Sequence, residues 1–152
     1  MKSEEAAVLR KIFLSLSLVL FVACLGFNSF CLEGTRFGPG FGPLLLGGLL
    51  VFGGLGNMTW LANPLLLFSW IAVLNGSRQV AIYLSLSALA VSAMFLLAGT
   101  VGVEKGPMDI TCVGPGYWLW LASSAAASVS ALLTYPAVAT SATGLERDRS
   151  NE

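Results

Sequence analysis

The stretch that decides the fold is FGPLLLGGLLVFGGLGNMTWLANPLLLFSWIAVL, residues 41–74, which contains no charged side chain. A single membrane crossing needs about 20 apolar residues. As one unbroken α-helix these residues would extend roughly 50 Å, well beyond a hydrocarbon layer of about 30 Å. How this stretch meets the membrane therefore sets the topology of the whole chain.

Composition places the chain in a membrane. Of its 152 residues, 56% are hydrophobic and 11% are charged, whereas a soluble domain carries about 25% charged residues. Three further apolar runs of crossing length cover residues 12–32, 80–103 and 117–138. The sequence predicts an all-α integral membrane protein with four transmembrane helices. Residues 12–138 would form the membrane domain, between tails at 1–11 and 139–152, the second of them disordered.

The positions of Lys and Arg favour one crossing by residues 41–74 rather than two. With one crossing, six basic residues lie on the predicted inner side and two on the outer side, whereas two crossings leave four on each side. Since cytoplasmic flanks carry the excess of Lys and Arg, we expect both termini in the cytoplasm of a bacterial cell, with the chain in its inner membrane. The inner set is Lys2, Arg10, Lys11, Arg78, Arg147 and Arg149, and the outer set is Arg36 and Lys105.

A single crossing of this length predicts a break, and Asn63–Pro64 supplies one. Proline disfavours helical geometry in the residue before it, and Asn followed by Pro is a good helix start. We expect a helix over about 43–60 and a short second helix over about 64–74 that bends along the inner interface or dips in and returns. One kinked helix and two full crossings are the alternatives. The residues of this polar helix-break site are Asn57, Thr59, Trp60, Asn63 and Pro64.

Small residues recur at heptad-like spacing in three of the apolar runs. Such residues let helix backbones approach closely in lipid. They can form a subunit interface or contacts within one bundle, and the spacing alone fits both. The candidate helix–helix interface residues are Gly47, Gly54, Ser85, Ser92, Gly99, Ser123, Ala127 and Ser130.

Two of the three cysteines fall in segments on the predicted outer side. Cys31 lies at the outer end of the first apolar run, and Cys112 precedes the last run. An oxidising compartment would allow a disulfide between them, and two unpaired thiols are the alternative. Cys24 lies inside the first run, where a thiol packs as a small apolar group.

Several function classes lose support from what the sequence lacks. The chain has no histidine, so Ser-His and Cys-His nucleophile pairs cannot form within it. No ionisable side chain lies deep in an apolar run, where proton-coupled carriers usually place one. The net charge is zero, which gives no basic surface for nucleic acid. We expect no enzymatic activity, cofactor, metal or nucleic-acid partner.

The segments GNMTWLANPLLLFSWIAVLNGSRQ and GPGYWLWLASS carry a resemblance to known proteins. The chain resembles a loose group of small bacterial inner-membrane proteins with a WxANP turn after a Gly-rich helix and a final helix that opens with GYxLWL. The resemblance covers roughly residues 40–130 and implies four membrane helices, but its motifs carry no known chemistry. The matching positions are Trp60, Ala62, Asn63, Pro64, Gly116, Tyr117, Leu119 and Trp120.

Our leading interpretation is a non-enzymatic structural or interaction subunit of a membrane assembly. Within the lipid bilayer, it would associate with copies of itself or with another membrane protein, because small residues recur and reactive groups are scarce. The alternative is an oligomeric pore or a carrier of small uncharged solutes. The glycines of residues 47–56 and the polar break at 57–64 favour that alternative.

Overall fold

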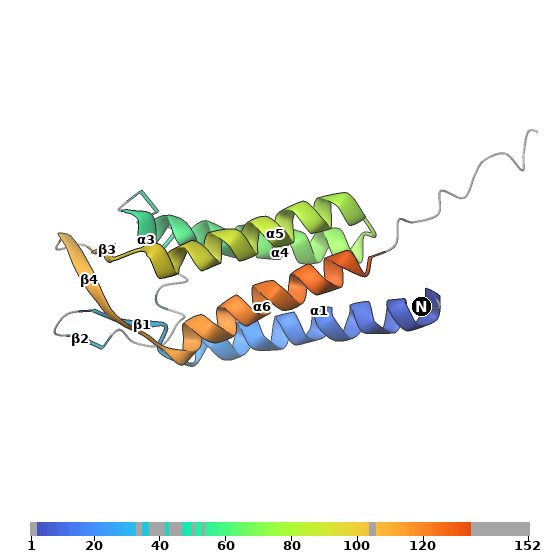
Figure 1. Cartoon of the computed structure of the whole chain (residues 1–152), viewed down its shortest axis with the longest axis horizontal. Helices are drawn as coiled ribbons and strands as arrows, with labels where there is room; N and C mark the ends of the chain where they lie inside the picture. The colour runs from blue at the N-terminus through green and yellow to red at the C-terminus, as the bar shows by residue number, and fades with distance from the viewer. Residues whose placement is uncertain are drawn as a thin grey trace, which may run out of the picture.

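The computed structural model describes residues 3–32, 35–36, 42, 47–49, 51–52, 54–103 and 106–134. Long helices run side by side, and a small antiparallel sheet lies at one end of them (Figure 1). The long helices are α1 (Ser3–Leu25), α4 (Ala62–Leu74), α5 (Arg78–Met94) and α6 (Pro115–Leu132). The short helix α3 (Leu55–Met58) and the 3-10 turn η1 (Thr59–Leu61) lead into α4, and the 3-10 turn η2 (Phe95–Leu97) follows α5.

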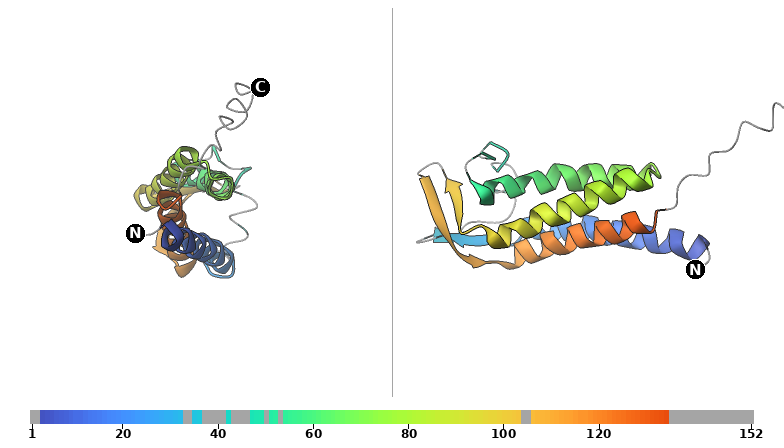
Figure 2. Two further views of the ribbon diagram at one scale, coloured as in Figure 1. Left: turned by 90° about the vertical axis from the view of Figure 1, so that its right-hand side faces the viewer. Right: turned by 45° about the horizontal axis from the view of Figure 1, so that its top comes forward.

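Successive long helices alternate in direction. The chain approaches the sheet along α1 and α5 and leaves it along α4 and α6 (Figures 1 and 2). The start of α1, the end of α6 and the turn between α4 and α5 therefore share the end opposite the sheet. This arrangement is the one expected when a chain traverses a layer an even number of times.

Three helical segments are long and apolar enough to cross a membrane: Glu4–Cys24, Leu55–Leu74 and Arg78–Leu97. The fourth long helix, α6, is not among these three segments, and Ser and Ala make up much of it. It lies between α1 and the α4–α5 pair and packs against all three helices (Figure 2). The long helix outside that set of three is thus the central one.

The described part of residues 41–74 runs along the bundle once, but two expectations about its geometry are wrong. Residues 47–49 and 51–52 form turns, so no helix extends over 43–60, and the helix begins only at Leu55. From Leu55 to Leu74 the chain is helical, with a change from 3-10 to α geometry at Ala62. Those residues extend about 30 Å, which matches a hydrocarbon layer without a break.

The expected break at Asn63 and Pro64 is therefore replaced by continuous helix. Leu61, and not Asn63, is the N-cap residue of α4. Pro64 lies in the first turn of α4, where a missing backbone N–H is tolerated. Proline thus marks the start of the regular α-helix here.

The all-α expectation is also incomplete, because a sheet forms from the ends of the apolar runs 12–32 and 80–103 and from the segments beside them. Its strand order is β2-β1-β4-β3, and every neighbouring pair is antiparallel. The outer strands pair locally, while the central pair joins the segment after α1 to the segment before α6. The strands are β1 (Phe30–Leu32), β2 (Thr35–Arg36), β3 (Thr100–Val103) and β4 (Gly106–Val113).

Two apolar clusters hold these parts together. The first lies between the helices and contains Leu14, Leu66, Trp70, Ala72, Val73, Ala81, Ala88, Ala127 and Ala131. The second lies between the sheet and the ends of α5 and α6, and contains Phe30, Leu32, Phe95, Val101 and Tyr117. Because the second cluster draws on strands and helices alike, the sheet packs onto the bundle as part of one fold.

Candidate functional site at the junction of helices and sheet

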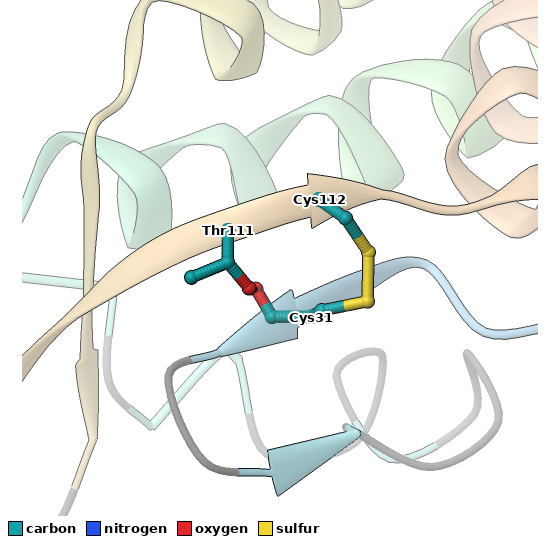
Figure 3. The surroundings of a disulfide bond; sticks show 3 residues. All are labelled: Cys31, Thr111 and Cys112. Atoms are coloured by element: carbon teal, nitrogen blue, oxygen red, sulfur yellow. A yellow bond between two sulfur atoms is a disulfide. The ribbon is translucent and has the colours of Figure 1, made fainter.

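A disulfide joins the two outer segments of the chain. Cys31 in β1 and Cys112 in β4 stand opposite each other with Cα atoms 4.9 Å apart, and their sulfur atoms are bonded (Figure 3). Beside this pair the register shifts, and the extra residue, Thr111, donates its hydroxyl to the Cys31 carbonyl at 3.4 Å. These are the two cysteines that the sequence placed on one side of the membrane. Cys24 stays free and buried in α1.

Asn57 in α3 fastens the start of the second crossing to the sheet. Its Nδ2 donates to the Gly102 carbonyl at 2.9 Å, and its Oδ1 accepts from the Gly102 N–H at 2.7 Å. Gly102 stands opposite Pro107 of β4, which has no N–H to give. Both backbone groups of Gly102 thus face away from β4, and the side-chain amide takes the position that another strand would occupy at this edge.

Two other members of the expected helix-break site, Thr59 and Asn63, also use their polar groups in structural hydrogen bonds. Thr59 donates to the Gly56 carbonyl at 2.6 Å, and Asn63 accepts a hydrogen bond from Trp120 of α6. The amides of Asn57 and Asn63 face different elements, so the structure does not bring them together in one polar site. Among the described residues, no buried side-chain nitrogen or oxygen lacks a hydrogen-bond partner.

The two motifs that carry the resemblance contact each other in space. Trp120 of GYWLWL donates its indole N–H to Oδ1 of Asn63 of WLANP at 2.9 Å. Tyr117, which is buried, donates its hydroxyl to the Ser92 carbonyl of α5 at 3.1 Å. These hydrogen bonds tie the sheet-side end of α6 to α4 and to α5.

The start of α6 also lies close to the segment that follows α1. The Gly116 N–H donates to the Asn28 carbonyl at 3.0 Å. A Cβ at Gly116 would come 2.7 Å from the Phe27 carbonyl oxygen, so only glycine fits without displacing backbone. The GYxLWL residues thus position the first turns of α6 against α4, α5 and the segment that follows α1.

A polar contact deep in the bundle was missed by the sequence analysis. Ser17 of α1 and Ser123 of α6 are fully buried, and each hydroxyl donates to the other residue's carbonyl, at 2.9 and 2.8 Å. Trp70 of α4 donates its indole N–H to the Ser17 hydroxyl at 2.9 Å, which brings a third helix to the same point. Ser15 is exposed on the same helix, so composition alone could not single out Ser17.

The small-residue stripes pack inside the chain. The fully or almost fully buried members are Ala81, Ser85, Ala88 and Ser92 on α5, and Ser123, Ala127 and Ser130 on α6. The Ser130 hydroxyl donates to the Arg10 carbonyl of α1 at 3.0 Å. Of the two interpretations of these stripes, the structure supports contact within one bundle. Gly47, Gly54 and Gly99 lie outside the long helices, so their assignment to a helix–helix interface is wrong.

Known families, curated proteins and solved structures were compared with the chain, and none matches. The chemistry of the junction must therefore be inferred from its own side chains. Its hydroxyl, amide and indole groups bind backbone groups or one another. Within the four described strands the acidic residue is Asp109, which is exposed. Such an arrangement holds the sheet in a fixed position on the helices.

Proposed function

We propose that this chain is a non-enzymatic interaction subunit of a bacterial inner-membrane assembly that crosses the membrane four times. The sheet would lie on the periplasmic side and both termini in the cytoplasm. The supporting observation is that a disulfide joins the two central strands of a polar-faced sheet, while the paired hydrogen bonds of Asn57 attach the edge of that sheet to the bundle. A rigid surface outside the membrane suits recognition of another protein, because little conformational freedom is lost on binding.

The charge distribution supports this orientation. Arg10, Lys11 and Arg78 lie at the end of the bundle opposite the sheet. Cytoplasmic flanks are the ones enriched in Lys and Arg, and disulfides persist in the periplasm. The distribution of Lys and Arg and the position of the disulfide are independent criteria, and both favour the sheet on the periplasmic side.

The partner surface should be the exposed face of the sheet. The described α5 and α6 stripes are buried within the chain, so they no longer argue for a second copy as the partner. Thr100, Asp109 and Thr111 are exposed on β3 and β4. A second copy of the chain or another membrane protein can bind there, and the experiment below distinguishes them.

Site-specific photo-crosslinking in native membranes tests the proposal. A photoreactive amino acid at Asp109 or at Thr111 should give adducts larger than the 15.9 kDa chain, and mass spectrometry would identify the attached protein. The matched control is the same amino acid at Ser15, which is exposed on α1 within the apolar run. It should give no protein adduct, because lipid surrounds it.

The proposal fails if neither sheet position gives an adduct and the chain, purified gently in detergent, has the mass of one copy. The pore or carrier alternative has lost its main support, because the amides of Asn57 and Asn63 serve structural contacts. Faster flux of uncharged solutes through liposomes containing the purified chain would revive that alternative and count against the subunit role.

A further inference from the structure

The second crossing leaves part of the uncharged run unused. The helix occupies Leu55–Leu74, whereas the apolar sequence begins at residue 41. The described turns at 47–49 and 51–52 lie beside α3, at the sheet end of that crossing (Figures 1 and 2). Phe52 is 94% exposed and Leu49 is 82% exposed, the highest values among the large apolar side chains of the described residues.

Trp60 shows the level at which this apolar turn lies. A Cβ at Gly48 would come 2.9 Å from Cζ2 of Trp60, so the indole ring lies directly against the glycine backbone. Trp60 follows Leu55 by five residues, which is about 8 Å along the helix axis. Its side chain leans toward the start of the helix. Gly48 is therefore beside the first turns of the crossing helix and not beyond its end.

Exposed apolar side chains also occur on the first turns of the crossing helix. Leu55, Met58 and Leu61 are each between 42% and 47% exposed. No charged residue occurs anywhere between Arg36 and Arg78. The turn and the first turns of the helix thus both expose apolar side chains and carry no charge. Because lipid surrounds a crossing helix, we expect the turn beside it to face lipid as well.

We propose that the turns at residues 47–49 and 51–52 dip into the sheet-side leaflet and place Leu49 and Phe52 among the lipid acyl chains. The depth must be shallow, since irregular backbone needs water or headgroups to satisfy its polar groups. Trp60 then lies near the interface, where tryptophan is enriched. The inference concerns lipid contact, and it does not depend on the proposed interaction role.

Fluorescence quenching in liposomes tests this placement. The background variant is Cys24→Ala, in which the remaining cysteines, Cys31 and Cys112, are joined in the disulfide. Leu49→Cys and Phe52→Cys are each labelled with an environment-sensitive dye. Two matched controls are Leu67→Cys, half exposed near the middle of α4, and Thr100→Cys, exposed on β3. Lipids brominated near the headgroup and lipids brominated near the chain end serve as quenchers.

The expected result is blue-shifted emission at Leu49 and Phe52, quenched more strongly by bromine near the headgroup. Leu67 should show the opposite depth preference, and Thr100 should emit as in water without quenching. Water-like emission at both turn positions would overturn the proposal. Blue-shifted emission that no brominated lipid quenches would overturn it as well, because protein would then cover the turn.

Discussion

The indole of Trp120 and the amide of Asn63 are joined by a hydrogen bond of 2.9 Å that links α6 to the first turn of α4. This contact gives Asn63 a role that differs from helix capping. It also explains how two motifs far apart in sequence can form one structural unit. The unit lies at the sheet end of the bundle, where Trp120 packs against the apolar cluster that includes Tyr117.

Removing the indole N–H should weaken this unit. We expect Trp120→Phe to lower the free energy of unfolding by about 0.5–2 kcal/mol, the range measured for hydrogen bonds between membrane helices. Unfolding in detergent–denaturant mixtures measures the effect. Trp118→Phe is the control, since Trp118 is half exposed and should tolerate the change. Equal losses in both variants would show that aromatic packing, and not the hydrogen bond, matters.

Close approach of α1 and α6 should make Ser123 intolerant of large side chains. Its hydroxyl donates to the Ser17 carbonyl at 2.8 Å, and the residue is fully buried. We expect Ser123→Leu to destabilise the bundle by about 1–3 kcal/mol or more through overpacking. The neighbouring Ala122→Leu should have little effect, because Ala122 is exposed. A tolerated leucine at position 123 would contradict the observed packing, and thermal unfolding in detergent measures both variants.

The edge of the sheet should depend on both polar atoms of Asn57. Asn57→Asp keeps an acceptor for the Gly102 N–H but removes the donor to the Gly102 carbonyl, and it sets a negative charge beside that oxygen. We expect a loss of about 1–3 kcal/mol and faster hydrogen exchange in the peptide that contains Gly102. Asn75→Asp, in the exposed turn at the far end of the bundle, is the matched control. Unchanged exchange at Gly102 would contradict the role of Asn57.

The disulfide should be present in cells and should stabilise the sheet. Under denaturing, non-reducing conditions we expect one cysteine, Cys24, to react with a maleimide polymer, and all three to react after reduction. Because the bridge spans a sequence separation of 81, Cys31→Ser with Cys112→Ser should cost about 2–5 kcal/mol. Three reactive thiols without reduction would place these residues in a reducing compartment.

Topology can be measured independently of stability. A fluorescent protein fused after Glu152 should fluoresce, and alkaline phosphatase at the same position should be inactive, because both termini are expected in the cytoplasm. The reverse pattern would invert the proposed orientation or change the number of crossings. A phosphatase fusion truncated after Val103 should be active, since that residue ends β3 on the opposite side.

The sequence predicted the number of long helices and their alternation because charges and apolar runs follow directly from the energetics of the bilayer. It also placed Cys31 and Cys112 on the same side of the membrane, which allowed a disulfide without deciding between a bond and two free thiols. It did not predict the sheet, since three of the four strands have only two to four residues and carry little periodic signal. The eight-residue β4 begins with Gly106 and Pro107, which indicate a loop. The break at Asn63–Pro64 was a reasonable local interpretation, but tertiary contacts with Trp120 and a later helix start at Leu55 replaced it.

The position of α6 has a consequence for biogenesis. This helix leaves the ribosome after α1, α4 and α5, yet α1 packs mainly against it. Until α6 arrives, α1 has no principal neighbour, and the carbonyls that accept from Ser123 and Ser130 lack those donors. We therefore expect the earlier helices to wait in the translocon or with an insertase, and the bundle to close only after α6 has emerged.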